Sequence, residues 1–284
     1  MVSQRNREKG CRPFLKWAGG KYRLLHRIAP LLPQGERLVE PFAGSAAVWL
    51  NSRHEAALIC DRNADLIALY RCLQREGEAF IDFCGQFFTK ESNCRDTYEL
   101  LRGEFNATSD EVRKAALFLY LNRHGFNGLI RYNGKGRFNV PFGTHKTPYF
   151  PRAEMRAFYT RTVECDTVFL AGDFRDCFGL IREGDAVYCD PPYLPHSPTA
   201  NFTAYAGSFG LAEHEALARL AAHTAGNGIP VLLSNHDTAL SRRLYAGAYL
   251  EAFSVQRHIS CKGGERRAVP ELLALFERRT PDCL

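Results

Sequence analysis

Five short strand-like runs, dominated by apolar residues and each followed directly by a turn, constrain the fold of this chain more than any other feature. The runs cover residues 37–40, 57–60, 167–170, 186–189 and 230–234, with helix-like segments between several of them. A strand that is apolar on successive residues is buried on both faces, which is typical of parallel sheets. The sequence therefore predicts an α/β fold in which helices cover both faces of a largely parallel sheet.

Residues 68–162 follow a different pattern. Apolar residues recur there at helical spacing up to Leu121, and residues 123–152 are then rich in Gly, Asn, Pro, Arg and aromatic residues without a clear period. A loop-rich stretch of this length inside a compact protein is usually functional. We therefore expect residues 68–162 to form a mainly helical insert, and residues 1–67 and 163–284 to form two parts of one α/β domain.

The ten cysteines of the chain argue by their spacing against both disulfides and zinc. No two are spaced as Cys-x-x-Cys, and no cysteine pair lies near a histidine pair at ligand spacing. The N-terminus has no apolar run that could serve as a signal peptide, and the longest apolar runs are too short to span a bilayer. We expect a monomeric cytoplasmic protein without metal or membrane contact. Its net charge of +6 favours an anionic partner only weakly.

Three groups of residues lie directly after predicted strands, where open parallel sheets bind their ligands. The small-residue turn at 42–46 lets a ligand approach the backbone at a helix N-terminus. Asp61 ends the next strand 17 residues after Gly44, close to the spacing of about 20 residues expected for an acid that binds ribose hydroxyls. Asp190 ends a third strand. A helix-capping role for Asp61 is the alternative, and a nicotinamide site is disfavoured because Gly-x-Gly-x-x-Gly is absent.

Asp190 begins the tetrapeptide Asp190-Pro191-Pro192-Tyr193, which directly follows a buried strand and is suited to holding an amine for reaction. The exocyclic amine of adenine is a poor nucleophile because its lone pair is delocalised into the ring. Asp190 and the Pro191 carbonyl can each accept a hydrogen bond from that amine, and consecutive prolines hold the carbonyl in a rigid turn. Tyr193 offers a face on which a base lifted from a duplex can stack. The pattern predicts methyl transfer to an amine by positioning and electrostatics; a proline-rich surface turn is the alternative.

The predicted insert has its own charge pattern, since no acidic residue occurs between Glu111 and Glu154. Asparagines and aromatic residues are interleaved with basic ones in this stretch. Basic side chains neutralise phosphates, Asn and Arg can read base edges, and aromatic rings can stack or wedge between bases. A solvated basic face is the alternative, but a loop-rich insert without acids favours double-stranded DNA as the partner. The basic residues are Arg113, Lys114, Arg123, Arg131, Lys135, Arg137, Lys146 and Arg152.

Four segments in this order, at residues 14–21, 39–44, 190–193 and 234–237, resemble the Dam-type DNA adenine N6-methyltransferases of the D12 or alpha class. The similarity runs from about residue 14 to residue 276. The resemblance implies a Rossmann-like, S-adenosylmethionine-dependent methyltransferase core with an inserted, mainly helical DNA-recognition domain. It further implies methyl transfer to N6 of adenine in GATC with base flipping, in a bacterial or phage cytoplasm where the enzyme associates with the nucleoid through DNA.

The resemblance also assigns site residues. The catalytic residues would be Asp190, Pro191 and Tyr193, and the cofactor would contact Trp17, Lys21, Phe42, Gly44, Asp61, Asp173, Phe174 and Asp190. The glycine loop of the family often reads Phe-x-Gly-x-Gly, and Ala46 stands here at the last position. We expect Ala46 to fit helical backbone angles and cofactor binding to survive. His236 is expected to be structural and not a general base.

Residues 122–133 resemble the recognition hairpin of the family. A residue at the position of Phe126 would insert into the duplex, Asn127, Leu129 and Arg131 would read bases, and Arg131 is assigned to a guanine. Lys16 and Pro141 fall on base-contact positions, Asn133 and Asn139 on backbone-contact positions, and His145 on another contact. Phe126 and His145 each replace a tyrosine of the family, which leaves stringency at one base open.

Three other functions remain open on the sequence alone. One is a methyltransferase acting on RNA or on protein amides, and Asp190 disfavours the amide enzymes, where Asn is common. Another is a sequence-specific DNA-binding protein with weak or lost catalysis, disfavoured by the complete residues 190–193 and by Asp61. The third is a nicotinamide-dependent enzyme.

Overall fold

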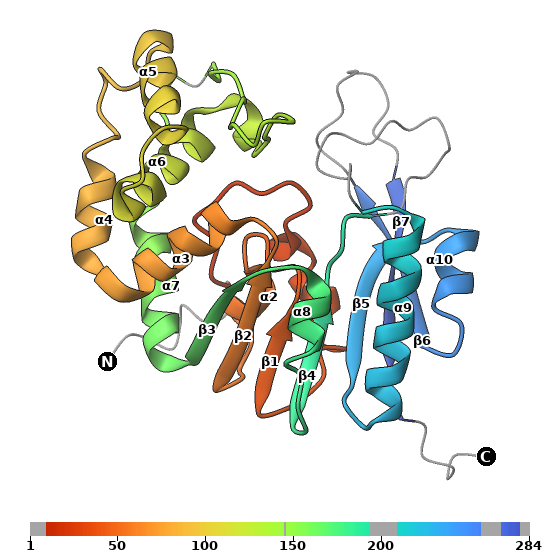
Figure 1. Cartoon of the computed structure of the whole chain (residues 1–284). Helices are drawn as coiled ribbons and strands as arrows, with labels where there is room; N and C mark the ends of the chain where they lie inside the picture. Colours follow the sequence, from red (N-terminus) through yellow and green to blue (C-terminus); the bar gives the residue numbers. More distant parts are fainter. Residues whose placement is uncertain (1–9, 145, 194–208, 257–267, 279–284) are drawn as a thin grey trace.

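The sheet of the computed structural model has seven strands in the order β3-β2-β1-β4-β5-β7-β6 (Figure 1). The structure describes residues 10–144, 146–193, 209–256 and 268–278. β1 to β5 pair in parallel, whereas β7 pairs antiparallel with both β5 and β6. The strands are β1 (Arg37–Glu40), β2 (Ala56–Asp61), β3 (Asp166–Ala171), β4 (Asp185–Cys189), β5 (Val231–His236), β6 (Tyr249–Gln256) and β7 (Ala268–Phe276). The predicted α/β class and its five parallel strands are confirmed.

Helices lie on both faces of this sheet, and the buried side chains divide accordingly. Leu38 and Ile59 face a cluster with α2, α3 and α7, while their neighbours Val39 and Leu58 face a cluster with α8 and α9. The helices are α1 (Leu25–Ile28), α2 (Ala47–Asn51), α3 (Ala64–Glu76), α4 (Glu78–Gly85), α5 (Arg95–Phe105), α6 (Glu111–His124), α7 (Arg152–Glu164), α8 (Phe174–Phe178), α9 (Leu211–Gly226) and α10 (Ala239–Leu244), with short 3₁₀ helices η2 (Lys21–Leu24) and η3 (Phe126–Gly128).

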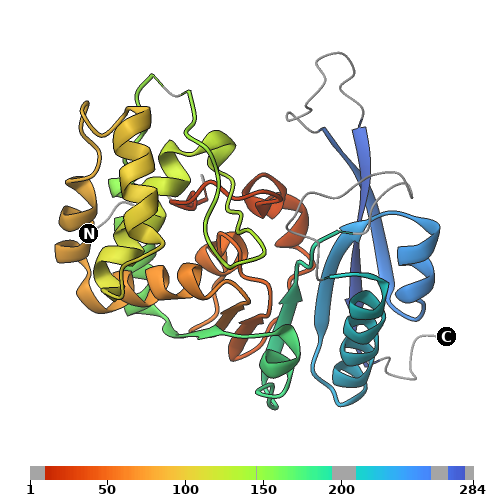
Figure 2. The same cartoon turned by 45° about the horizontal axis from the view of Figure 1, so that its top comes forward.

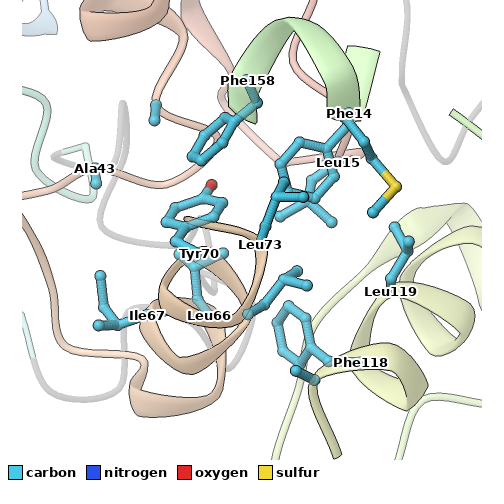
Figure 3. Close-up of a cluster of buried hydrophobic side chains, with 14 of the residues drawn as sticks. Phe14, Leu15, Ala43, Leu66, Ile67, Tyr70, Leu73, Phe118, Leu119 and Phe158 are labelled. Carbon is cyan, nitrogen blue, oxygen red and sulfur yellow. The ribbon is translucent and has the colours of Figure 1, made fainter. Parts of the chain in front are cut away.

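The helices α4 to α6 share one continuous core with the sheet. Figure 3 shows Phe158 of α7 and Phe14 beside Tyr70 of α3, with Phe118 of α6 nearby. The ring of Tyr70 stacks on Phe158 at 4.7 Å between centroids and meets Phe14 edge-on at 5.9 Å. The predicted junctions at 67/68 and 162/163 fall inside α3 and α7. The division into a catalytic domain and an insert stays a prediction.

Among the residues that the structure describes, eight cysteines are free thiols. No described helix is long and apolar enough to cross a membrane. Among the described side chains, no cluster of His, Cys, Asp and Glu is arranged to hold a metal ion.

Candidate active site at the carboxyl edge of the sheet

The turn after β1 is shaped by Gly44. Its φ of +48° is one that glycine adopts without strain, and a Cβ there would lie 2.7 Å from Nε1 of Trp17. Its N–H donates to Oδ2 of Asp61 over 2.9 Å, and its carbonyl accepts the Tyr70 hydroxyl over 2.6 Å. The turn is thereby fixed against the end of β2, and the backbone at Gly44 lies directly against Trp17.

Asp61 is held by two backbone donors, because the N–H of Asn63 binds Oδ1 over 2.9 Å. Burial raises the pKa of this carboxyl. The N-cap of α3 is Asn63, whose side chain accepts from the N–H of Leu66 over 3.1 Å. Asp61 is therefore not the helix cap, and the capping alternative is wrong.

Ala46 departs from the sequence expectation. Its φ of +55° and ψ of +33° are left-handed, so the expectation that it fits helical angles is wrong. Alanine in this region is strained by about 1–2 kcal/mol relative to its usual conformations. The Ala46 methyl is completely buried in the core, and that burial offsets part of the strain. The next residue, Ala47, begins α2.

Asp190 lies half-buried directly after β4 and binds two donors through one oxygen. Lys21 Nζ lies 2.8 Å from its Oδ1, and the hydroxyl of Ser234 donates to the same oxygen over 2.8 Å. Lys21 also donates to the Gly19 carbonyl over 2.7 Å. Sequence reasoning did not assign Ser234, although its place in β5, which pairs with β4 in the sheet, was a usable signal.

Tyr193 lies beside Asp190 with both its ring and its hydroxyl in contact. Lys21 Nζ is 4.6 Å from the ring centroid, and the ring of His236 meets it edge-on at 4.8 Å. The hydroxyl donates to Oε2 of buried Glu271 over 3.3 Å. Burial, together with Asp190 and Glu271, raises the pKa of Tyr193. His236 is buried against this ring, and its structural role stays a prediction.

Glu40 is a second group that the sequence reasoning did not assign. It ends β1, is 2% exposed, and accepts the N–H of Trp49 through Oε1 over 2.5 Å. Burial, with a smaller contribution from the charge of Asp190, raises its pKa to about 8. Three adjacent strands, β2, β1 and β4, thus end in or beside carboxyl groups.

Two phenyl rings and a helix cap form the side of this edge nearest α8. Phe42 stacks on Phe174 at 5.5 Å with an interplanar angle of 27°. Asp173 caps α8, and its Oδ1 also binds Arg175 Nη1 over 3.0 Å. The predicted cofactor residues from these two turns therefore lie together.

The predicted DNA-reading residues lie in the segment after α6 and beside the first loop of the chain. Asn122 binds the backbone of Lys16 in both directions, accepting over 2.9 Å and donating over 2.7 Å. Burial and the charge of Arg123 lower the pKa of Lys16. Phe126 is 49% exposed, as an inserting residue requires, and its N–H donates to the Pro141 carbonyl over 2.9 Å.

The base-reading candidates differ in exposure and backbone conformation. Asn127 adopts a left-handed φ of +54°, while Leu129 is half-buried. Arg131 is exposed, and its guanidinium donates through Nε to Oδ1 of Asn139 over 2.8 Å. Asn133 is exposed and accepts two backbone N–H groups. His145 lies outside the described residues.

Comparison with known proteins identifies the family of this chain. Residues 17–259 match the model of the D12 class N6 adenine-specific DNA methyltransferases. A DNA adenine methylase of Salmonella typhimurium strain LT2 is 48% identical over 270 residues, covering 95% of this chain and 96% of the relative. The DNA adenine methylase of Escherichia coli K12 is 47% identical with the same coverage. An rRNA methyltransferase from Streptomyces viridochromogenes covers 97% of this chain and 94% of its own at 11% identity, with a TM-score of 0.41. The chain belongs to the D12 class of N6 adenine-specific DNA methyltransferases.

Proposed function

We propose that this enzyme transfers a methyl group from S-adenosylmethionine to N6 of the adenine in GATC, on a base turned out of the duplex. The observation that carries the proposal is the pairing of two features at one sheet edge. Asp190 is fixed by Lys21 and Ser234 after β4, and the Gly44 turn is fixed by Asp61 across β1 and β2. One edge thus offers an amine acceptor beside a nucleoside site.

The residues at the Gly44 turn fit this cofactor. The backbone at Gly44 is free of a Cβ and lies against the indole of Trp17, and the carboxylate of Asp61 has a fixed orientation from which it can accept ribose hydroxyls. Phe42 and Phe174 would flank the cofactor adenine, with Lys21, Asp173 and Asp190 nearby. S-Adenosylmethionine supplies an electrophilic methyl group on a sulfonium.

Asp190 would polarise the target amine. Among the described residues, the donors that bind Asp190 both use Oδ1, so Oδ2 faces no described donor and can accept an amine hydrogen. The Pro191 carbonyl would accept the second hydrogen, which favours an sp³-like nitrogen. Lys21 would leave the Tyr193 ring as the flipped base stacks there.

Target recognition would come from the segment at 126–141. Phe126 would insert into the duplex. Bases would be contacted by Asn127, Leu129, Lys16 and Pro141, and the DNA backbone by Asn133 and Asn139. The fork of Arg131 can bind O6 and N7 of a guanine together, and its contact with Asn139 already orients it.

Methyl transfer to a GATC duplex, a GATT duplex and an RNA of matched sequence tests the proposal. We expect transfer to the GATC duplex alone, binding of S-adenosylmethionine by calorimetry, and loss of transfer without loss of DNA binding in Asp190→Ala. Exposed Asp166, at the far end of β3, gives the control Asp166→Ala, which should keep full activity.

Arg131→Ala tests the base assignment in the same assay. It should relax discrimination at one base pair by about 1–3 kcal/mol. Equal loss on cognate and mismatched duplexes would make Arg131 a phosphate contact. Transfer by Asp190→Ala, equal transfer to RNA, or absence of cofactor binding would overturn the proposed function.

A further inference from the structure

A side-chain hydrogen bond joins the base-reading hairpin to the turn beside the cofactor site. The hairpin consists of residues 131–139, in which Tyr132 stands between Arg131 and Asn133. The hydroxyl of Tyr132 donates to Oδ2 of Asp65 over 2.6 Å, and Asp65 lies in the first turn of α3. Figure 2 shows the yellow-green segment after α6 passing beside the orange α3. The two residues are 67 positions apart in the sequence.

Hydrogen bonds join the two strands of the hairpin, so a displacement of Tyr132 would displace its neighbour Arg131. Tyr132 and Phe138 form an antiparallel bridge, and the N–H of Asn139 donates to the Arg131 carbonyl over 3.0 Å. Phe138 is buried, and its backbone binds the side chain of Asn106 in both directions, over 2.7 and 3.0 Å. One strand of the hairpin is therefore anchored beside α5, and the other reaches α3 through Tyr132.

The opposite end of the contact leads to the cofactor turn. Asp65 follows Asp61 by four residues, and the N–H of Asn63 binds Oδ1 of Asp61. Lys114 Nζ of α6 lies 2.9 Å from Oδ1 of Asp65, which leaves Oδ2 to Tyr132. The Asp65 side chain is 19% exposed, so water competes weakly for this charge-assisted hydrogen bond. A carboxylate that would bind the cofactor ribose is thus connected through one helical turn to the hairpin.

We propose that Tyr132 is a positioning residue for target specificity, and that its bond to Asp65 couples occupancy of the cofactor site to reading of the target sequence. The inference rests on the proposed function. A ligand bound to Asp61 would further restrict motion at the start of α3, and thereby of Asp65, Tyr132 and Arg131. By linkage, the cofactor and the cognate DNA must raise each other's affinity by the same factor.

Tyr132→Phe is the direct test because it removes only the hydroxyl. The ring keeps its edge contact with Phe138, at 5.8 Å between centroids. Tyr149→Phe is a matched control, because the Tyr149 hydroxyl donates to the Glu154 carboxylate over 3.0 Å without touching the hairpin. Thermal unfolding checks that both variants are folded.

Two quantities are measured for the full-length enzyme. The first is the ratio of kcat/KM between a cognate duplex and a duplex with one target base pair exchanged. The second is the Kd of cognate DNA with and without sinefungin, a stable analogue of the cofactor. In Tyr132→Phe we expect the ratio to fall about tenfold, equivalent to 1.4 kcal/mol, and the effect of sinefungin on DNA affinity to shrink severalfold. We expect kcat on saturating cognate DNA to stay within about twofold of wild type, and Tyr149→Phe to change neither quantity.

A double-mutant cycle identifies the partner. In an Asp65→Ala background, Tyr132→Phe should have no further effect on discrimination, because the acceptor is already gone. An unchanged ratio and unchanged linkage in Tyr132→Phe would overturn the inference. So would an equal effect of Tyr149→Phe, or a full effect in the Asp65→Ala background. If wild type itself fails to bind sinefungin or to discriminate between duplexes, the proposed function fails instead.

Discussion

Substitution of Glu40 by glutamine should raise the free energy of unfolding relative to wild type, and this gain should increase as the pH rises. Glu40 ends β1 inside the protein, and its main polar contact is the N–H of Trp49 at 2.5 Å. Its pKa is raised to about 8 by burial and by nearby Asp190. Glutamine has the same shape as the protonated acid and still presents an oxygen to Trp49, but it cannot ionise.

The size of the effect follows from proton linkage. Between about pH 4.5 and pH 8 the folded protein holds a proton on Glu40 that the unfolded chain has released, so unfolding releases a proton. The protonated Glu40 therefore contributes fully to the free energy of unfolding below pH 4.5, the pKa in the unfolded chain. This contribution is lost as the pH rises toward about 8, the pKa in the folded protein. Each pH unit corresponds to about 1.4 kcal/mol. From pH 5.5 to pH 7.5, Glu40→Gln should gain about 2–3 kcal/mol over wild type.

Thermal unfolding of the cofactor-free enzyme at closely spaced pH values measures this gain. With an unfolding entropy of about 2.1 cal/mol/K per residue, 2–3 kcal/mol in a chain of 284 residues shifts Tm by about 3–5 °C. The difference between variant and wild type cancels the titration of all other groups. Glu164→Gln, on the exposed end of α7, is a control for the loss of a carboxylate at the surface. A difference between Glu40→Gln and wild type that does not change with pH would refute the raised pKa of Glu40, whatever constant cost the amide brings.

Three further substitutions test the turn and the acceptor. Gly44→Ala places a Cβ 2.7 Å from Nε1 of Trp17 at a φ of +48°, and should lower the free energy of unfolding by at least about 2 kcal/mol in urea titration. Ala46→Gly should change it by less than about 1 kcal/mol, because relief of strain and loss of a buried methyl offset each other; a larger change contradicts this balance. Ser234→Ala removes one donor to Asp190, and in single-turnover assays should lower the methyl-transfer rate about tenfold without changing DNA affinity; an unchanged rate shows that Lys21 alone holds the carboxylate.

The parallel half of the sheet could be predicted because its signal is local. Runs of apolar residues ending in turns identify β1 to β5, and the rule that ligands bind at strand ends points to Gly44, Asp61 and Asp190. The antiparallel strands β6 and β7 escaped this reasoning. β7 contains Pro270, which lacks an N–H and normally counts against a strand, and buried Glu271, which breaks the apolar run.

The contacts that the sequence reasoning missed have a different cause, because each joins residues that are far apart in the sequence. Ser234 reaches Asp190 from the neighbouring strand, and Tyr132 reaches Asp65 from the hairpin at residues 131–139. Nothing in the local sequence of either partner encodes the other. Ala46 shows a related limit, because a left-handed backbone is imposed there by the turn around Gly44 and not by the residue type.

Several carboxyl groups lie at this edge of the sheet, and the raised pKa of Glu40 limits the negative charge that gathers there. In the proposed mechanism Asp190 accepts a hydrogen bond from the target amine, and an ionised Glu40 nearby would add a negative charge to the same edge of the sheet. Because burial raises the pKa of Glu40 to about 8, this residue stays protonated at neutral pH, and Lys21 Nζ pairs with Asp190 2.8 Å away. On this argument Glu40 supports the turn after β1 as a protonated hydrogen-bond acceptor, and it leaves undisturbed the Lys21–Asp190 pair that the proposed mechanism uses.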